Sequence, residues 1–373
     1  MRIFAFHLLN DYSGSPKVLS QLVKGWKKAG FESIVVTNKD SDGFLSDLQG
    51  IKTIHFPYKF IKNKILRLFS LLYSQIALVA ILINQVKKDD IIYINTVLPF
   101  GAAILAKLKG CQVVYHIHET TVKPKVLKYF LFYLVEKMAS KIVFVSEYLR
   151  DQSQLDPVRS SIILNSIEDS FLIVANAAKE KLSKPENILM VCSLKKYKGV
   201  DEFVRLAREH PNLNFRLVVN APVQEIDAYW DPNSLPDNLE VLPTQKNVHP
   251  HYQWSHIVVN LSRPDGWIET FGLTAVEAMA YHRPVIVPPV GGITELVRDN
   301  KEGFQVDSRN STVLSGKVKE LTANQALYKE MALNSGLRVS NFKEQKMIEA
   351  SISLLLQLQS QELEGFQISE HIG

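Results

Sequence analysis

Cysteine is scarce in this sequence, and the patterns that define several common kinds of site are missing. The 373 residues include two cysteines, Cys111 and Cys192, which are too few for a disulfide framework or a cysteine-rich metal site. We therefore expect a reducing, cytoplasmic environment, and the apolar run at the start, interrupted by His7, is too short for a secretory signal. No G-x-G-x-x-G motif follows the first expected strand, which argues against a nicotinamide dinucleotide site.

Charge is unevenly distributed, although neither sign is scarce. Residues 1–170 contain 22 Lys and Arg against 14 Asp and Glu, a balance of +8, whereas residues 171–373 have a balance of −3. A basic first half indicates an anionic partner. Nucleic acid is not expected, because zinc-finger spacing, RNP-like aromatic motifs and Gly-Arg tracts are absent from the sequence. An anionic membrane surface fits better.

The longest apolar stretch, residues 68–83, lies between basic residues at 59–67 and at 87–88. It is shorter than the ~20 residues that a membrane-spanning helix needs, and Ser and Gln residues interrupt it. Two interpretations of 59–88 stay open: a helix buried against a sheet, and an interfacial helix with a basic collar. A second segment, 123–134, mixes Lys with aromatic residues, a composition that suits the headgroup region of an anionic leaflet.

Short β-rich runs alternate with helix-length segments along the whole chain. The expected strands are 2–9, 33–37, 91–95, 113–119, 141–146 and 161–165, followed in the second half by 187–194, 215–220, 239–243, 256–262, 284–289 and 303–307. This alternation predicts an α/β fold with parallel sheets covered on both faces. The length suits two domains, and the pattern predicts two Rossmann-like domains that face each other across a cleft. Apolar periodicity fades over 176–184, so we place the boundary there, between residues 178 and 179.

The most informative stretch is 262–296, which contains two glutamates, Glu269 and Glu277, separated by seven residues. Apolar residues recur at helical spacing from Leu273 onward, which predicts a helix beginning near Gly272, with Glu269 before it and Glu277 in its second turn. The amides of Phe271, Gly272 and Leu273 would then be unpaired at the helix start, where anions and phosphate in particular bind. Taken singly, each glutamate fits a structural role better than a functional one.

The order E-x7-E, with Phe-Gly inside it and PVI-x-PPVGG-x-x-EL behind it, resembles the C-terminal signature of the family 4 retaining glycosyltransferases, which have the GT-B fold. The resemblance is close over about 258–304 and loose elsewhere. It implies a nucleotide diphosphate sugar donor, most often UDP- or GDP-linked, and no required metal or other cofactor. Glu269 would be a catalytic residue that orients the donor sugar, Glu277 would accept from the ribose hydroxyls, and the amides of Phe271, Gly272 and Leu273 would hold the diphosphate.

The segment after Pro185 resembles the strand, R-x4-K-G loop and helix that bind the donor diphosphate in this family. Lys198 and Gly199 match, but the family's arginine falls on Ser193, and a hydroxyl cannot replace a bidentate guanidinium. Lys195 is our candidate for the missing charge, and whether it takes that part stays open. On the same resemblance, 179–340 is the donor domain and 1–178 the acceptor and membrane-docking domain. The closing helix, 341–373, would pack back on the first domain.

Two residues of the first half also match family positions. Gly14 lies in a turn-rich loop after the first strand, where the family has glycines near the donor phosphates; a plain tight turn is the alternative. His118 ends the expected strand 113–119, where a family histidine contacts the donor sugar or the acceptor; a structural histidine is the alternative. Asp40-Ser41-Asp42 spells the D-x-D metal signature of the other large glycosyltransferase fold, but we expect a solvated loop there and no metal site.

The resemblance implies a retaining glycosyltransferase that acts on a glycan, in particular a lipid-linked one, in bacterial capsule, O-antigen or exopolysaccharide synthesis. Such an enzyme would work at the inner face of the plasma membrane as a peripheral protein. Two alternatives stay open: a nucleotide-sugar epimerase on the same fold, and a non-catalytic membrane-associated protein with a GT-B core, which the loss of the arginine at Ser193 permits.

Overall fold

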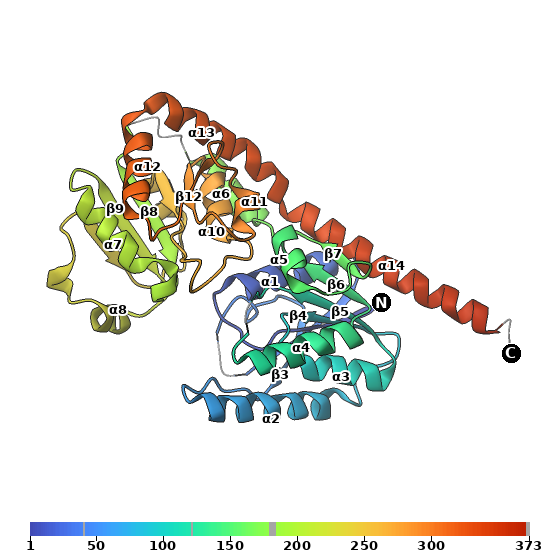
Figure 1. Ribbon diagram of the computed structural model, residues 1–373. Helices are drawn as coiled ribbons and strands as arrows, with labels where there is room; N and C mark the ends of the chain where they lie inside the picture. Colours follow the sequence, from blue (N-terminus) through green and yellow to red (C-terminus); the bar gives the residue numbers. More distant parts are fainter. Residues whose placement is uncertain (40–41, 121, 179–183, 371–373) are drawn as a thin grey trace. The chain divides into compact units, whose positions relative to one another are not determined.

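The computed structural model describes residues 1–39, 42–120, 122–178 and 184–370, and only the backbone for 361–370. The chain divides into two compact units (Figure 1). Unit 1 comprises Met1–Asn165 together with the segment that begins at Glu344, and unit 2 comprises Ser166–Lys343. The boundary expected from the sequence, between 178 and 179, lies later in the chain, beside 179–183, which are outside the described residues.

Unit 1 contains a seven-stranded sheet in the order β3-β2-β1-β4-β5-β6-β7, and all its paired strands are parallel. Its elements, in chain order, are β1 (Arg2–Phe6), α1 (Gly14–Lys28), β2 (Glu32–Asn38), β3 (Lys52–Phe56), α2 (Lys64–Leu82), β4 (Ile91–Asn95), α3 (Phe100–Lys109), β5 (Gln112–Ile117), α4 (Lys125–Met138), β6 (Lys141–Phe144), α5 (Glu147–Ser153), β7 (Ser160–Ile162) and α14 (Glu344–Glu370).

Unit 2 contains a six-stranded parallel sheet in the order β10-β9-β8-β11-β12-β13. Its elements are α6 (Asp169–Ala177), β8 (Asn187–Cys192), η1 (Lys196–Lys198), α7 (Val200–Glu209), β9 (Asn214–Val219), α8 (Val223–Tyr229), η2 (Pro232–Ser234), β10 (Leu239–Leu242), α9 (His249–Trp254), β11 (Ile257–Val259), α10 (Leu273–Ala280), β12 (Val285–Val287), α11 (Ile293–Leu296), β13 (Gly303–Gln305), α12 (Ser311–Ala323), α13 (Gln325–Arg338) and η3 (Val339–Phe342). The prediction of two α/β units with parallel sheets is confirmed.

Strand order reverses once in each sheet, between β1 and β4 in unit 1 and between β8 and β11 in unit 2. In open parallel sheets ligands bind at such reversal points, outside the carboxyl ends of the strands. The loops that follow β1, β4 and β5 in unit 1, and β8 and β11 in unit 2, therefore carry the residues of functional interest.

Right-handed crossovers decide which helices share a layer. The chain moves in one direction along the unit 1 sheet from β3 through β4, β5 and β6, so α2, α3 and α4 cover the same face, and α3 contacts both of its neighbours. The opposite face carries α1, against which the closing helix α14 packs. Trp26 of α1 is fully buried, and its Nε1 donates to Oγ of Ser351 at 2.9 Å.

Helix α2 exposes much of its apolar surface. Five of its residues are buried, namely Leu71, Ser74, Gln75, Leu78 and Leu82, and they form one stripe along the helix. Gln75 fastens this stripe to α3, because its Oε1 accepts from the backbone N–H of Gly101 at 2.8 Å. Helix α2 therefore packs against α3 and β3 along this stripe, whereas many of its other apolar side chains are exposed, so each interpretation of 59–88 describes one side of the helix. Among the helices that the structure describes, α2 is the one whose length and apolar composition would allow it to cross a membrane. This criterion considers length and composition only.

Candidate active site

The loops after β8 and β11 bring together two of the predicted site residues, Lys198 and Glu269. The ammonium of Lys198 donates to Oε1 of Glu269, and the two side chains are 16% and 12% exposed. The same oxygen accepts from Oγ of Ser262 at 2.6 Å and from Nδ2 of Asn260 at 3.5 Å. Burial alone would raise the pKa of Glu269, but the charge of Lys198 and these hydrogen bonds outweigh it and lower the pKa below its usual value. Glu269 is therefore a carboxylate held in its charged form.

Helix α10 begins at Leu273 with Gly272 as its N-cap, as the sequence predicts. Gly272 has a φ of +108°, a conformation that favours glycine, and a Cβ there would lie 2.7 Å from the side chain of Ile293. Phe271 is 2% exposed, so its side chain belongs to the core. The described residues supply no acceptor for the amides of Phe271, Gly272 and Leu273, and these amides are suited to an anion.

The first glycine of the P-P-V-G-G turn, Gly291, supports the loop that carries Glu269. Gly291 has a φ of +106°, and a Cβ on it would lie 2.4 Å from the backbone oxygen of Glu269. A side chain at this position would displace the loop, so the sequence motif behind the two glutamates has a direct steric function.

Glu277 lies in the second turn of α10, as predicted, and is 7% exposed. Its Oε2 accepts from the hydroxyl of Tyr252 on α9 at 2.8 Å. Tyr252 is fully buried and stacks on Tyr281, with ring centroids 5.9 Å apart. Burial first, and then the charge of Glu277, raise the pKa of Tyr252 well above its usual value, so this hydroxyl is a donor that orients the carboxylate. Sequence reasoning did not identify Tyr252.

Lys195, the candidate to replace the family arginine, is exposed and precedes η1. The structure describes no ion pair between it and Glu269, so it does not join the buried pair. Beside that pair are two aromatic residues, because Lys198 Nζ lies 5.1 Å from the ring centroid of Trp267, which stacks on Tyr197 at 5.6 Å. This cation–π contact with Trp267 also helps to hold the ammonium group of Lys198 in place.

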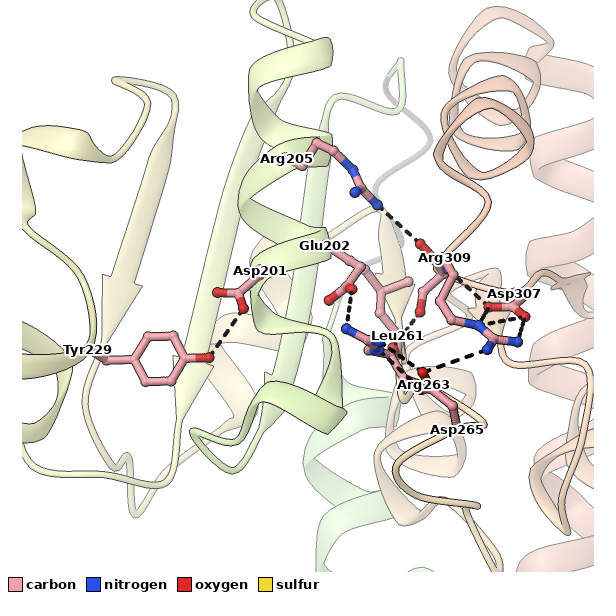
Figure 2. Close-up of polar contacts among 10 residues, drawn as sticks. Asp201, Glu202, Arg205, Tyr229, Leu261, Arg263, Asp265, Asp307 and Arg309 are labelled. Carbon is pink, nitrogen blue, oxygen red and sulfur yellow. Dashed lines mark hydrogen bonds and ion pairs between the residues drawn. The ribbon is translucent and has the colours of Figure 1, made fainter.

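A network of ion pairs holds the loop after β11 against α7 and against the loop after β13 (Figure 2). Arg263 pairs with Glu202 of α7 at 3.3 Å and with Asp265 at 2.9 Å, and its backbone N–H donates to the oxygen of Tyr197. Arg309 links Asp265 to Asp307, and Figure 2 shows both carboxylates turned toward its guanidinium. Because Arg263 belongs to the loop that carries Glu269 and also bonds to Tyr197 of η1, the network fixes the distance between this loop and η1.

In unit 1 the structure brings the loop of Gly14 near His118 through one side chain, Asn95. Gly14 is exposed at the first position of α1, and His118 directly follows β5. Asn95, the last residue of β4, has its Oδ1 2.8 Å from Nε2 of His118 and its Nδ2 3.0 Å from the backbone oxygen of Ser15. The two predicted residues therefore belong to one polar cluster at the strand reversal point.

Glu119 follows His118, and its Oε2 accepts from the backbone N–H of His118 at 3.2 Å. Burial raises the pKa of Glu119 to about 7, although nearby backbone N–H groups partly oppose this shift. A carboxyl group that changes charge near neutrality thus lies beside the predicted His118.

The D-x-D triplet is described only at its third residue, because Asp40 and Ser41 lie outside the described residues. Asp42 is exposed and accepts from Tyr12 and Ser46, each at 2.7 Å. Among the described residues, no group of three or more His, Cys, Asp or Glu side chains is placed to hold a metal ion.

Both halves of the chain match models of known families. Residues 12–171 match the model described as Glycosyltransferase Family 4, and residues 175–337 match Glycosyl transferases group 1. Fold and family matches together define a glycosyltransferase, an enzyme that transfers a sugar. The chain belongs to the glycosyl transferases group 1, of the family 4 type, with the GT-B fold.

Known relatives agree with this assignment. A glycosyltransferase of Haemophilus influenzae is 24% identical over 72% of this chain and 76% of that protein. The capsular polysaccharide biosynthesis glycosyltransferase CapM of Staphylococcus aureus is 26% identical over 58% of this chain and 62% of that protein. The solved structure of Anabaena Alr3699/HepE in complex with UDP and glucose superposes with a TM-score of 0.79 at 19% identity, covering 95% of this chain and 98% of that one. This structural likeness concerns the fold.

Proposed function

We propose that this glycosyltransferase moves a sugar from a nucleotide diphosphate donor to a glycan acceptor with retention of anomeric configuration and without a required metal. The observation that carries the proposal is the buried pair of Lys198 and Glu269 next to the open amides at the start of α10. A cation and a helix N-terminus suit a diphosphate, and a fixed carboxylate suits sugar hydroxyls. The UDP and glucose bound to the Anabaena protein support a UDP-linked donor.

In the proposed reaction the bond between the anomeric carbon and the diphosphate oxygen breaks, and the acceptor hydroxyl oxygen bonds to the same carbon. Lys198 and the amides of Phe271, Gly272 and Leu273 stabilise the charge that grows on the leaving diphosphate. Glu269 orients the donor sugar, and Glu277, fixed by Tyr252, accepts from the ribose hydroxyls. Neither carboxylate is assigned as a covalent nucleophile. Attack therefore comes from the same face as departure, and the leaving phosphate takes the acceptor proton.

Calorimetric titration with UDP, GDP and ADP, without added metal, tests the donor site. We expect one nucleotide to bind and Glu277→Ala to weaken it strongly, whereas Glu269→Gln keeps the nucleotide affinity and loses turnover. Equal loss of both in Glu269→Gln would contradict the assignment of roles, and no binding of any nucleotide would favour a non-catalytic protein.

A product assay with and without a lipid-linked glycan acceptor tests the reaction class. Transfer that depends on the acceptor, with the anomeric configuration of the donor preserved by NMR, supports the proposal. Release of free altered sugar without an acceptor would instead indicate an epimerase.

We further propose that unit 1 docks on the inner, anionic leaflet of the plasma membrane, where a lipid-linked acceptor would lie, as in bacterial surface polysaccharide synthesis. The docking surface consists of the exposed large apolar residues of α2 and α4, which are Ile65, Leu66, Leu68, Phe69, Leu72, Tyr73, Ile76 and Ile81 together with Val126, Tyr129, Phe130 and Tyr133. Phe69 and Ile76, one heptad apart, are 64% and 70% exposed. Because Gln75 ties α2 to α3, this helix lies on the protein and does not need to span a bilayer.

The lysines that border this docking surface favour an anionic lipid surface as its partner. Lys59, Lys62 and Lys64 lie at the start of α2, and Lys123 and Lys125 at the start of α4; all five are exposed. Each contributes about 1 kcal/mol near an anionic leaflet. Apolar side chains with a basic border fit a lipid surface better than a second copy of the same basic surface, which would repel it.

Vesicle co-sedimentation tests this docking surface. Wild type should bind vesicles with phosphatidylglycerol better than pure phosphatidylcholine vesicles, and the double variant Phe69→Ser/Ile76→Ser should lose most of the binding. The matched control is Leu333→Ser/Leu337→Ser on α13, where both leucines are also exposed (59% and 66%). Absence of vesicle binding by the wild type, or a self-association that only the α2 variant abolishes, would contradict the proposal.

A further inference from the structure

Several buried polar side chains lie close together at the carboxyl ends of β1, β4 and β5. Asn95 and His116 are fully buried, and His7 is 4% exposed. Buried polar groups of this kind are costly unless they are hydrogen-bonded in a defined way. The cluster adjoins His118, for which the family resemblance implies a contact with the donor sugar or the acceptor. The hydrogen bonds within the cluster therefore determine which ring nitrogen of His118 carries a hydrogen.

The backbone beside Asn95 adopts an unusual conformation. Thr96 has a φ of +75°, which is rare for a β-branched residue, and its backbone N–H donates to the oxygen of His116 at 2.8 Å. Such strain is retained where the surroundings over-determine it, commonly at functional sites. The turn after β4 is thus fixed, and the side chain of Asn95 is fixed with it.

The amide of Asn95 can be oriented from its neighbours. Its Nδ2 lies 3.0 Å from the backbone oxygen of Ser15, and an oxygen can only accept, so the NH2 group of the amide must face Ser15. The amide oxygen therefore faces His118, whose Nε2 lies 2.8 Å away. Because that oxygen can only accept, Nε2 of His118 must carry the hydrogen. The tautomer of His7, whose Nδ1 lies 3.0 Å from Nδ2 of Asn95, does not enter this argument.

The ring of His118 is neutral at physiological pH. Burial lowers the pKa of His118 well below its usual value, and the neighbouring His116 and His7 lower it further. In a neutral ring with the hydrogen on Nε2, Nδ1 has a lone pair and can only accept a hydrogen bond.

We infer that Asn95 is a positioning residue, which holds His118 in the Nε2–H tautomer and ties it to the loop of Gly14 through Ser15. His118 then offers its Nδ1 as an acceptor for a hydroxyl of the bound sugar and does not act as a cation toward the diphosphate. The tautomer follows from unit 1 alone, whereas the role toward a sugar hydroxyl rests on the proposed function.

Nitrogen-15 NMR of the histidine rings tests the tautomer without any substrate. Long-range proton–nitrogen spectra distinguish the two neutral tautomers, and His118→Gln identifies the resonances. We expect the Nε2–H pattern for His118 at pH 7 in the wild type, and a mixture of tautomers in Asn95→Ala. An Nδ1–H ring, or a protonated ring at pH 7, would overturn the inference, and the wild-type spectrum decides this even if the variant does not fold.

Asn38 provides a matched control. It also ends a strand next to β1 and is 3% exposed, but its Oδ1 accepts from the backbone N–H of Asn10. Asn38→Ala should therefore leave the His118 spectrum unchanged.

Kinetics test the consequence for the sugar. Asn95→Ala should lower kcat/KM for transfer by about 10²-fold through misplacement of His118, with nucleotide diphosphate affinity unchanged and Asn38→Ala near wild type. Unchanged transfer in Asn95→Ala would overturn the positioning role. If no transfer occurs in the wild type, the proposed function fails, and the NMR result still decides the tautomer.

Discussion

Lys198 donates a hydrogen bond to Glu269 across 71 residues of sequence, and the exposed fractions of their side chains are 16% and 12%. At this depth each charge depends on the other, because removing one partner leaves an uncompensated buried charge. The pair joins the loop after β8 to the loop after β11, so its loss affects both folding and the candidate site.

Replacing Lys198 by Met should destabilise the protein by about 3–5 kcal/mol, because Glu269 remains buried without its cation. The double variant Lys198→Met/Glu269→Gln should regain much of this loss, since no charge is left unpaired. Urea denaturation of the two single variants and the double variant gives the coupling energy. Additive effects of the two substitutions would contradict a dependence of each charge on the other.

Tyr252→Phe should weaken nucleotide diphosphate binding, because it removes the hydroxyl that orients Glu277. A hydrogen bond to a charged group contributes about 1.5–3 kcal/mol, so we expect roughly a tenfold or greater loss of affinity by calorimetry. Tyr281→Phe is the matched control, because Tyr281 stacks on Tyr252 but has its hydroxyl 2.7 Å from Nδ1 of His249. Equal affinity of wild type and Tyr252→Phe would show that Glu277 needs no such orientation.

Gly291→Ala should lower turnover strongly, because the new Cβ would meet the backbone oxygen of Glu269 in a conformation that disfavours side chains. Gly316→Ala, in α12, is the control. A Cβ at Gly316 meets nothing within 4 Å, and alanine in a helix should stabilise by roughly 0.5–1 kcal/mol. Steady-state kinetics together with thermal unfolding separate the two effects, and normal turnover of a folded Gly291→Ala protein would refute the steric role.

Glu119 gives a prediction for pH dependence. The pKa of Glu119 in the folded protein, about 7, lies above its usual value, so the folded state binds the proton more tightly. Its contribution to stability is complete at acidic pH, below the usual carboxyl pKa, and is lost as pH rises to about 7. Glu119→Gln should therefore gain on the order of 1–3 kcal/mol relative to wild type between pH 4.5 and pH 8.

Urea denaturation of wild type and Glu119→Gln at several pH values measures this difference. Titrating groups that do not interact with Glu119 affect both proteins equally, so the difference between the two proteins reports on Glu119. A constant difference between wild type and Glu119→Gln across this range would exclude the predicted linkage.

The sequence predicts the two α/β units well because buried parallel strands are short apolar runs, and such runs stand out between helices. It does not reveal β3, whose residues Lys52–Phe56 are mostly exposed or half-buried at the edge of the sheet. An edge strand needs little apolar sequence, and its place depends on β2, with which it pairs.

Within the candidate site, local motifs indicate Lys198, Glu269 and Glu277, because loop, helix start and spacing lie within short segments. Their partners could not be predicted in the same way. Tyr252 reaches Glu277 from another helix, and Asn95 reaches His118 from a neighbouring strand. These contacts depend on the order of the strands in each sheet, and a short stretch of sequence does not predict that order.

The division of the chain also affects the order of synthesis. Unit 1 begins with the first strand but takes its closing helix from the segment after Lys343, where Trp26 bonds to Ser351 across 325 positions. Every residue of unit 2 is therefore synthesised before α14. We expect unit 2 to fold before unit 1 is complete, because the face of α1 that packs against α14 stays uncovered until α14 has been synthesised. Unit 1 is thus begun before unit 2 and completed after it.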